Sequence, residues 1–126
     1  MRPKILVVED NDKNRYLVTF LLRHEGFEVI EAVDGRQCLD AACRELPDLI
    51  VLDIQMPEMD GYETAWRLKD DPRTASIPIV GVSSFAMTGD REKALQLGFA
   101  GYLEKPIAPE SFVQRIRGFL PPERCS

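Results

Sequence analysis

Long apolar segments are missing from this chain of 126 residues. A transmembrane helix needs about 20 consecutive apolar residues, and no run in the sequence approaches that length. The apolar run Ile5–Val8 near the N-terminus is too short for a secretory signal peptide. We therefore expect a cytoplasmic protein that has no membrane partner.

An excess of basic charge is also missing. The chain has 16 lysines and arginines against 21 acidic residues, a net charge of −5, and no basic cluster that would bind nucleic acid. The three cysteines, Cys38, Cys43 and Cys125, lack metal-ligand spacing and are expected to be reduced thiols. The hydrophobic share of 44% is typical of one globular domain. We expect the domain to span residues 1–120 and to be followed by a flexible tail, residues 121–126.

Short apolar runs alternate with segments of helical periodicity along the whole chain. The runs predict strands at residues 4–8, 28–32, 49–52, 77–82 and 101–103. The segments between them predict five helices. This alternation favours a parallel sheet covered by helices on both faces. We expect a doubly wound (βα)5, flavodoxin-like α/β fold with strand order 2-1-3-4-5.

Helical periodicity also assigns faces to the first two helices. The core face of the first helix is predicted to consist of Tyr16, Leu17, Phe20 and Leu21. Its exposed side, with Asn14, Arg15 and Val18, could then dock a partner. The core face of the second helix is predicted to consist of Leu39, Ala42 and Leu46.

Polar residues follow four of the predicted strands. They are Glu9 and Asp10 after the first strand, Asp53 after the third, Ser83 after the fourth and Lys105 after the fifth. In a sheet of this order, ligands bind outside the carboxyl ends of the strands at the point where the order reverses. We therefore expect these side chains to face one crevice.

Three neighbouring carboxylates repel one another, and a hard cation relieves that repulsion. Carboxylates, carbonyls and water are suitable ligands for Mg²⁺. We expect Asp10 and Asp53 to bind Mg²⁺ directly and Glu9 to bind it directly or through water. The backbone carbonyl of Gln55 can reach the same ion.

The remaining groups are suited to phosphoryl chemistry. Lys105 is a point charge for a phosphate oxygen, and Ser83 supplies a hydroxyl donor. Charge develops on the oxygens of a phosphoryl group during transfer, so placed positive charge assists the reaction. Asp53 is the predicted nucleophile, which would form an aspartyl-phosphate.

Four segments of the chain, in order and in spacing, resemble receiver domains of response regulators: Ile5–Asn11, Pro47–Gly61, Ile77–Ser83 and Gly101–Pro106. The pattern is most similar to stand-alone receivers of the DivK type and to receivers of hybrid histidine kinases. The resemblance implies a signalling protein of a two-component phosphorelay, not an enzyme beyond its own phosphorylation and dephosphorylation. It also implies a cis peptide bond between Lys105 and Pro106.

The resemblance further implies that Asp53 accepts a phosphoryl group from a phosphohistidine of a sensor histidine kinase or a histidine phosphotransfer protein. Ser83 and Tyr102 occupy the family's switch positions. Tyr102 would turn inward on phosphorylation and change the face formed by the fourth helix, fifth strand and fifth helix. A separate downstream target protein would read that face, with the receiver acting as a monomer or weak dimer.

Other functions remain open. A Mg²⁺-dependent aspartyl-phosphate phosphatase would need an acid two residues after its nucleophile, where this chain has Gln55. A flavin-binding module would need a glycine-rich loop after the first strand, and here that loop is acidic. The chain could also be a receiver fragment of a hybrid histidine kinase. A degenerate receiver that serves only as a scaffold is disfavoured, because every position of the expected site is filled.

Overall fold

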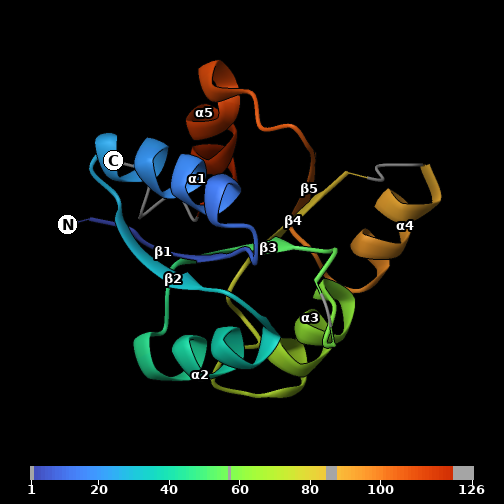
Figure 1. Ribbon diagram of the computed structural model, residues 1–126. Coiled ribbons are helices and arrows are strands. Elements are labelled where there is room, and N and C mark those ends of the chain that lie inside the picture. The colour runs from blue at the N-terminus through green and yellow to red at the C-terminus, as the bar shows by residue number, and fades with distance from the viewer. Residues whose placement is uncertain (1, 57, 85–87, 121–126) are drawn as a thin grey trace.

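Strands and helices alternate through the whole domain. The computed structural model describes residues 2–56, 58–84 and 88–120 (Figure 1). Within these ranges the strands are β1 (Lys4–Val8), β2 (Glu28–Ala32), β3 (Leu49–Asp53), β4 (Ile79–Ser83) and β5 (Gly101–Glu104). The helices are α1 (Asp12–His24), α2 (Gly35–Glu45), α3 (Gly61–Asp70), α4 (Thr88–Gln96) and α5 (Pro109–Phe119). The predicted tail, residues 121–126, lies outside the described residues.

The strands form one parallel sheet in the order β2-β1-β3-β4-β5. This confirms the predicted doubly wound, flavodoxin-like fold. The register pairs Val8 with Leu52, Asp53 with Val82, and Ser83 with Glu104. The carboxyl ends of β1, β3, β4 and β5 therefore lie together along one edge of the sheet.

Helices cover the sheet on both faces, with α1 and α5 on one side and α2 and α3 on the other (Figure 1). Alternate residues of each central strand enter the two cores. Ile5 and Val7 pack with Leu22 of α1 and Ile116 of α5, whereas the core on the opposite face contains Leu6 and Val8. This double burial explains why the strands are apolar throughout their length.

Polar side chains cap the starts of α1 and α3. Asn11 accepts a hydrogen bond from Asn14 N at 2.9 Å, and Asp60 accepts one from Glu63 N at 2.9 Å. Asn11 and Asp60 lie in the loops that follow β1 and β3. The caps therefore set where the chain turns away from the carboxyl edge of the sheet.

The predicted core face of α1 is partly wrong. Tyr16 is 69% exposed and Phe20 is 54% exposed, while Val18, which was expected on the outer side, is buried. The helix is apolar on two adjacent stripes, and the stripe that faces the sheet is Val18 and Leu22. Periodicity alone does not separate two such stripes, because both repeat every four residues.

Two further boundaries differ from the prediction. Leu46 is 56% exposed because α2 ends at Glu45 and Leu46 adopts a left-handed conformation with φ of 46°. The fourth strand starts at Ile79 instead of Ile77, after Pro78, which has no N–H for the strand ladder. Across the described ranges, no helix combines the length and the apolar character that crossing a bilayer requires.

Candidate functional site

The carboxyl edge of the sheet brings the predicted site residues together. Glu9 directly follows β1, Asp53 ends β3, Ser83 ends β4, and Lys105 directly follows β5. Glu9, Asp53 and Ser83 are almost completely buried, with exposed fractions of 5%, 2% and 1%. Residues that are up to 96 positions apart in the chain therefore share one buried site.

Three carboxylates form an acidic cluster at this edge. Glu9, Asp10 and Asp53 each offer an oxygen atom, and these atoms lie within 4.8 Å of one another. Asp53 Oδ1 accepts a hydrogen bond from Gln55 N at 3.2 Å, whereas Asp53 Oδ2 is buried and has no hydrogen-bond partner among the described residues. A buried, unpaired carboxylate oxygen beside two further carboxylates fits the ligand set of a hard divalent cation such as Mg²⁺.

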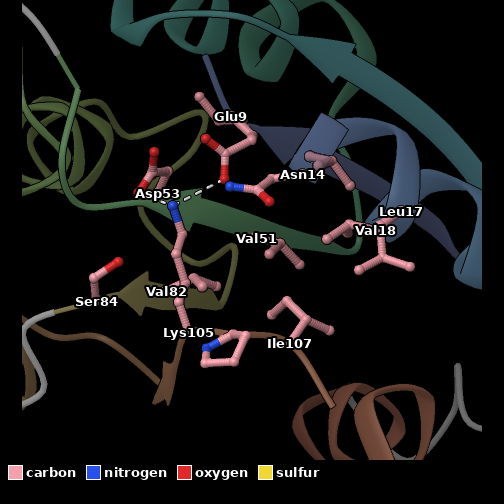
Figure 2. A pocket seen from close by; sticks show the side chains of 13 residues that line it. Glu9, Asn14, Leu17, Val18, Val51, Asp53, Val82, Ser84, Lys105 and Ile107 are labelled. Carbon is pink, nitrogen blue, oxygen red and sulfur yellow. Dashed lines mark ion pairs between the residues drawn. The ribbon is translucent and has the colours of Figure 1, made fainter. Parts of the chain in front are cut away.

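Lys105 bridges two of these carboxylates. Its Nζ lies 3.1 Å from Glu9 Oε1 and 3.1 Å from Asp53 Oδ1, as the dashed lines in Figure 2 show. Burial acts to lower the pKa of Lys105, but the hydrogen bond to Glu9 and the charge of Asp53 outweigh it, so the pKa is raised. The ammonium is therefore charged at neutral pH and points at the candidate nucleophile.

Burial dominates the ionisation of Asp53. Removal from water, together with the hydrogen bond and negative charge of Glu9, raises the pKa of Asp53 to about 7, although Lys105 acts in the opposite direction. Asp53 also borders a cavity of about 360 Å³, and the apolar lining of this cavity contributes to the low polarity around the carboxylate. Val18, Val51, Val82 and Ile107 line that cavity (Figure 2).

The side chain of Gln55 connects the loop after β3 to the end of β4. Its Nε2 donates a hydrogen bond to Ser83 Oγ, and its Oε1 accepts one from Ser84 N at 3.1 Å. The role expected for the Gln55 carbonyl, binding Mg²⁺, stays a prediction. The contact with Ser83 was missed because nothing in the spacing of the two residues indicates it.

Tyr102 lies in the interior. Its ring is 3% exposed, and within the described part of the chain its hydroxyl is buried without a hydrogen-bond partner. The ring therefore already occupies an inward position in this structure. The expected turning of Tyr102 on phosphorylation stays a prediction. The peptide bond between Lys105 and Pro106 is cis, which confirms the expectation drawn from the family resemblance.

Gly61 allows α3 to approach the backbone of the site. A Cβ at this position would lie 2.7 Å from the carbonyl oxygen of Asp53 and 2.7 Å from Cα of Ile54. Because these are backbone atoms, α3 must move to make room. Gly61→Ala should lower the free energy of unfolding by about 1–3 kcal/mol.

Urea unfolding measures that loss. Gly118→Ala is the matched control, since a Cβ there meets nothing within 4 Å and alanine favours the helix α5. The control should be at least as stable as the wild type. A Gly61→Ala protein of unchanged stability would mean that the close approach of α3 is not required.

Comparisons with known proteins agree with this geometry. The family model described as "Response regulator receiver domain" matches residues 5–117. The polar-differentiation response regulator DivK of Brucella anthropi is 40% identical over 120 residues, which cover 95% of this chain and 98% of that protein.

Two solved structures of similar fold also belong to signalling proteins, according to their names. The chemotaxis protein CheY4 of Vibrio cholerae has a TM-score of 0.90 and 28% identity, covering 95% of this chain and 100% of that one. The receiver domain of sensor histidine kinase PA1611 from Pseudomonas aeruginosa has a TM-score of 0.82 and 34% identity, covering 92% of this chain and 94% of that one. That structure has a magnesium ion coordinated in its active-site cleft. The chain belongs to the receiver domain family of response regulators, the signalling domains of two-component systems.

Proposed function

We propose that the protein is a phosphoacceptor switch in which Asp53 takes a phosphoryl group from a phosphohistidine of a sensor histidine kinase or a histidine phosphotransfer protein. An Asp53 carboxylate oxygen attacks phosphorus, and the bond between phosphorus and the imidazole nitrogen breaks. The electron pair of that bond stays on the imidazole. The observation that carries this proposal is the placement of Asp53 within 3.1 Å of Lys105 and inside the acidic cluster.

The acidic cluster is suited to hold Mg²⁺ during this transfer. Glu9, Asp10 and Asp53 would bind the ion together with the backbone carbonyl of Gln55. The unpaired Oδ2 of Asp53 supports this assignment, because a buried carboxylate oxygen without a partner is costly. When bound, the ion neutralises negative charge on the carboxylates and on the phosphoryl oxygens.

Two further side chains would contact the phosphoryl group. Lys105 now pairs with Glu9 and Asp53, and its flexible stem lets the ammonium follow a phosphoryl oxygen. Ser83 is held by Gln55, and its hydroxyl would donate to another phosphoryl oxygen. Both contacts would favour the phosphorylated conformation over the unphosphorylated one.

The signal would leave through the face formed by α4, β5 and α5. Ser83 and Tyr102 lie on adjacent strands, with Ser83 paired to Glu104 and Gly81 paired to Tyr102. Movement of the Ser83 hydroxyl toward the phosphoryl group would change the space around the buried Tyr102 ring. A downstream target protein would read the altered face. We propose a cytoplasmic monomer or weak dimer for this role.

A Mg²⁺-dependent phosphatase is the second candidate, and the site disfavours it. Gln55 lies two residues after Asp53, where the phosphatase needs an acid to protonate its leaving group. Its amide is instead occupied by Ser83 and the backbone N–H of Ser84. Turnover of a generic phosphate ester would support the phosphatase.

Incubation with acetyl phosphate and Mg²⁺, followed by intact mass spectrometry, tests the proposed function. We expect one phosphoryl group per chain, and none when a chelator replaces Mg²⁺. The chelated sample is the control for transfer that does not depend on Mg²⁺. A wild-type protein that gains no phosphoryl group in the presence of Mg²⁺ would contradict the proposal.

A further inference from the structure

Arg15, on the first turns of α1, contacts three segments of the chain. Its Nη1 donates to the backbone carbonyl of Glu9 at 3.0 Å, its Nε to Glu31 Oε1 at 3.1 Å, and its Nη2 to Asp12 Oδ1 at 2.7 Å. The side chain is 16% exposed. A guanidinium has its donors in a rigid planar fork, so three simultaneous contacts fix its position.

The carbonyl that Arg15 holds belongs to the peptide between Glu9 and Asp10. The rest of Glu9 is also fixed: its N–H donates to Ala32 O at 3.0 Å, and its carboxylate contacts Lys105 and accepts from Asn11 N at 3.2 Å. Because a peptide unit is planar, the bond from Arg15 sets the plane from which Asp10 leaves the strand. Asp10 is exposed, so the direction of its carboxylate depends on this backbone.

Glu31, on the edge strand β2, anchors the guanidinium. Its carboxylate pairs with Arg15 at 3.1 Å and with Arg23 at 3.3 Å. Arg23 also donates a hydrogen bond to Val29 O, which lies on β2 as well. Among the residues that the structure describes, no hydrogen bond or ion pair joins Arg23 to Glu9. The two arginines thus share one partner, while Arg15 alone reaches the acidic loop.

We propose that Arg15 is a positioning residue for the divalent cation: it holds the Glu9–Asp10 peptide so that both carboxylates face the ion, with Glu31 as its anchor. This inference rests on the proposed function, because it assigns Mg²⁺ to the cluster of Glu9, Asp10 and Asp53. It extends the site to β2, which supplies none of the predicted ligands.

The positive charge of Arg15 acts on the cation in the opposite direction, because like charges repel. The two effects are separable by substitution. Arg15→Lys keeps the charge but loses the fork that reaches Glu9, Glu31 and Asp12 together. Arg15→Met removes both. Positioning predicts weaker Mg²⁺ binding in both variants, whereas repulsion alone predicts unchanged binding in Arg15→Lys and tighter binding in Arg15→Met.

Calorimetric titration with Mg²⁺ alone measures the affinity without phosphorylation. We expect the dissociation constant to rise about tenfold or more in both Arg15 variants, as is typical when a residue that orients metal ligands is lost. Arg23→Met is the matched control, since it removes the other ion pair of Glu31, and its affinity should equal that of the wild type. Urea unfolding without Mg²⁺ checks that Arg15→Lys remains folded.

The outcomes separate this inference from the proposed function. Wild-type affinity in Arg15→Lys would overturn the positioning role, even if the wild type binds Mg²⁺ and accepts a phosphoryl group. Equal weakening in Arg23→Met would also overturn it, because the loss would then follow from Glu31 pairing in general. Absence of Mg²⁺ binding in every chain, the wild type included, would contradict the proposed function itself.

Discussion

Replacing Asp53 with alanine should abolish phosphorylation by acetyl phosphate. The substitution removes the carboxylate that lies 3.1 Å from Lys105, and with it the proposed nucleophile. Glu9, the other buried acid among the described residues, already pairs with Lys105 and accepts a hydrogen bond from the backbone N–H of Asn11, so it is not a substitute of equal geometry. We expect no phosphoryl group on the variant by intact mass, against one on the wild type.

The control for this variant is Asp70→Ala. Asp70 is an exposed acid at the end of α3, away from the carboxyl edge of the sheet, and its loss should leave phosphorylation unchanged. Circular dichroism would verify that both variants are folded. A phosphoryl group retained on Asp53→Ala would move the acceptor to another residue and would overturn the assignment of Asp53.

The free energy of unfolding of the protein in chelator should fall as the pH rises from about 4 to 8. The pKa of Asp53 is about 7 in the folded protein and near 3.8 in an unfolded chain. Between these values the folded state binds more protons than the unfolded state, so stability decreases with pH. The difference between the two pKa values corresponds to a loss of at most about 4 kcal/mol in the free energy of unfolding. This loss is absent below about pH 4 and complete above about pH 7.

Urea unfolding at several pH values, on the wild type and on Asp53→Asn, measures this dependence. The asparagine variant has no carboxylate to ionise, so its stability should change little over the same range. Added Mg²⁺ should restore stability to the wild type at pH 8, since a bound ion stabilises the ionised carboxylates. Equal pH dependence in the wild type and the variant would show that burial does not control the ionisation of Asp53.

Most of the fold could be predicted because burial of the strands on both faces of the sheet produces a simple pattern in the sequence. Strands such as Leu49–Asp53 are buried on both faces, so they appear as short apolar runs without alternation. Right-handed crossovers then leave few possible strand orders. The site residues followed from the same rule, because Asp53, Ser83 and Lys105 come at or just after the ends of strands.

Side-chain contacts were harder to predict than positions in the fold. Tyr16 and Phe20 looked like core residues because α1 is apolar on two stripes, and only the packing against β1 and α5 decides between them. The contacts of Gln55 with Ser83 and of Arg15 with Glu9 join residues of different segments. They depend on side-chain rotamers, which the hydrophobic periodicity of the sequence does not reveal.

The order of the strands along the chain also has a consequence for biosynthesis. Lys105 follows β5, which is the last strand to emerge from the ribosome, whereas Glu9 and Asp53 emerge much earlier. An incomplete nascent chain therefore has the two carboxylates but lacks the ammonium that bridges them. The full set of charged groups around Asp53 is therefore present only when nearly the whole domain has been translated.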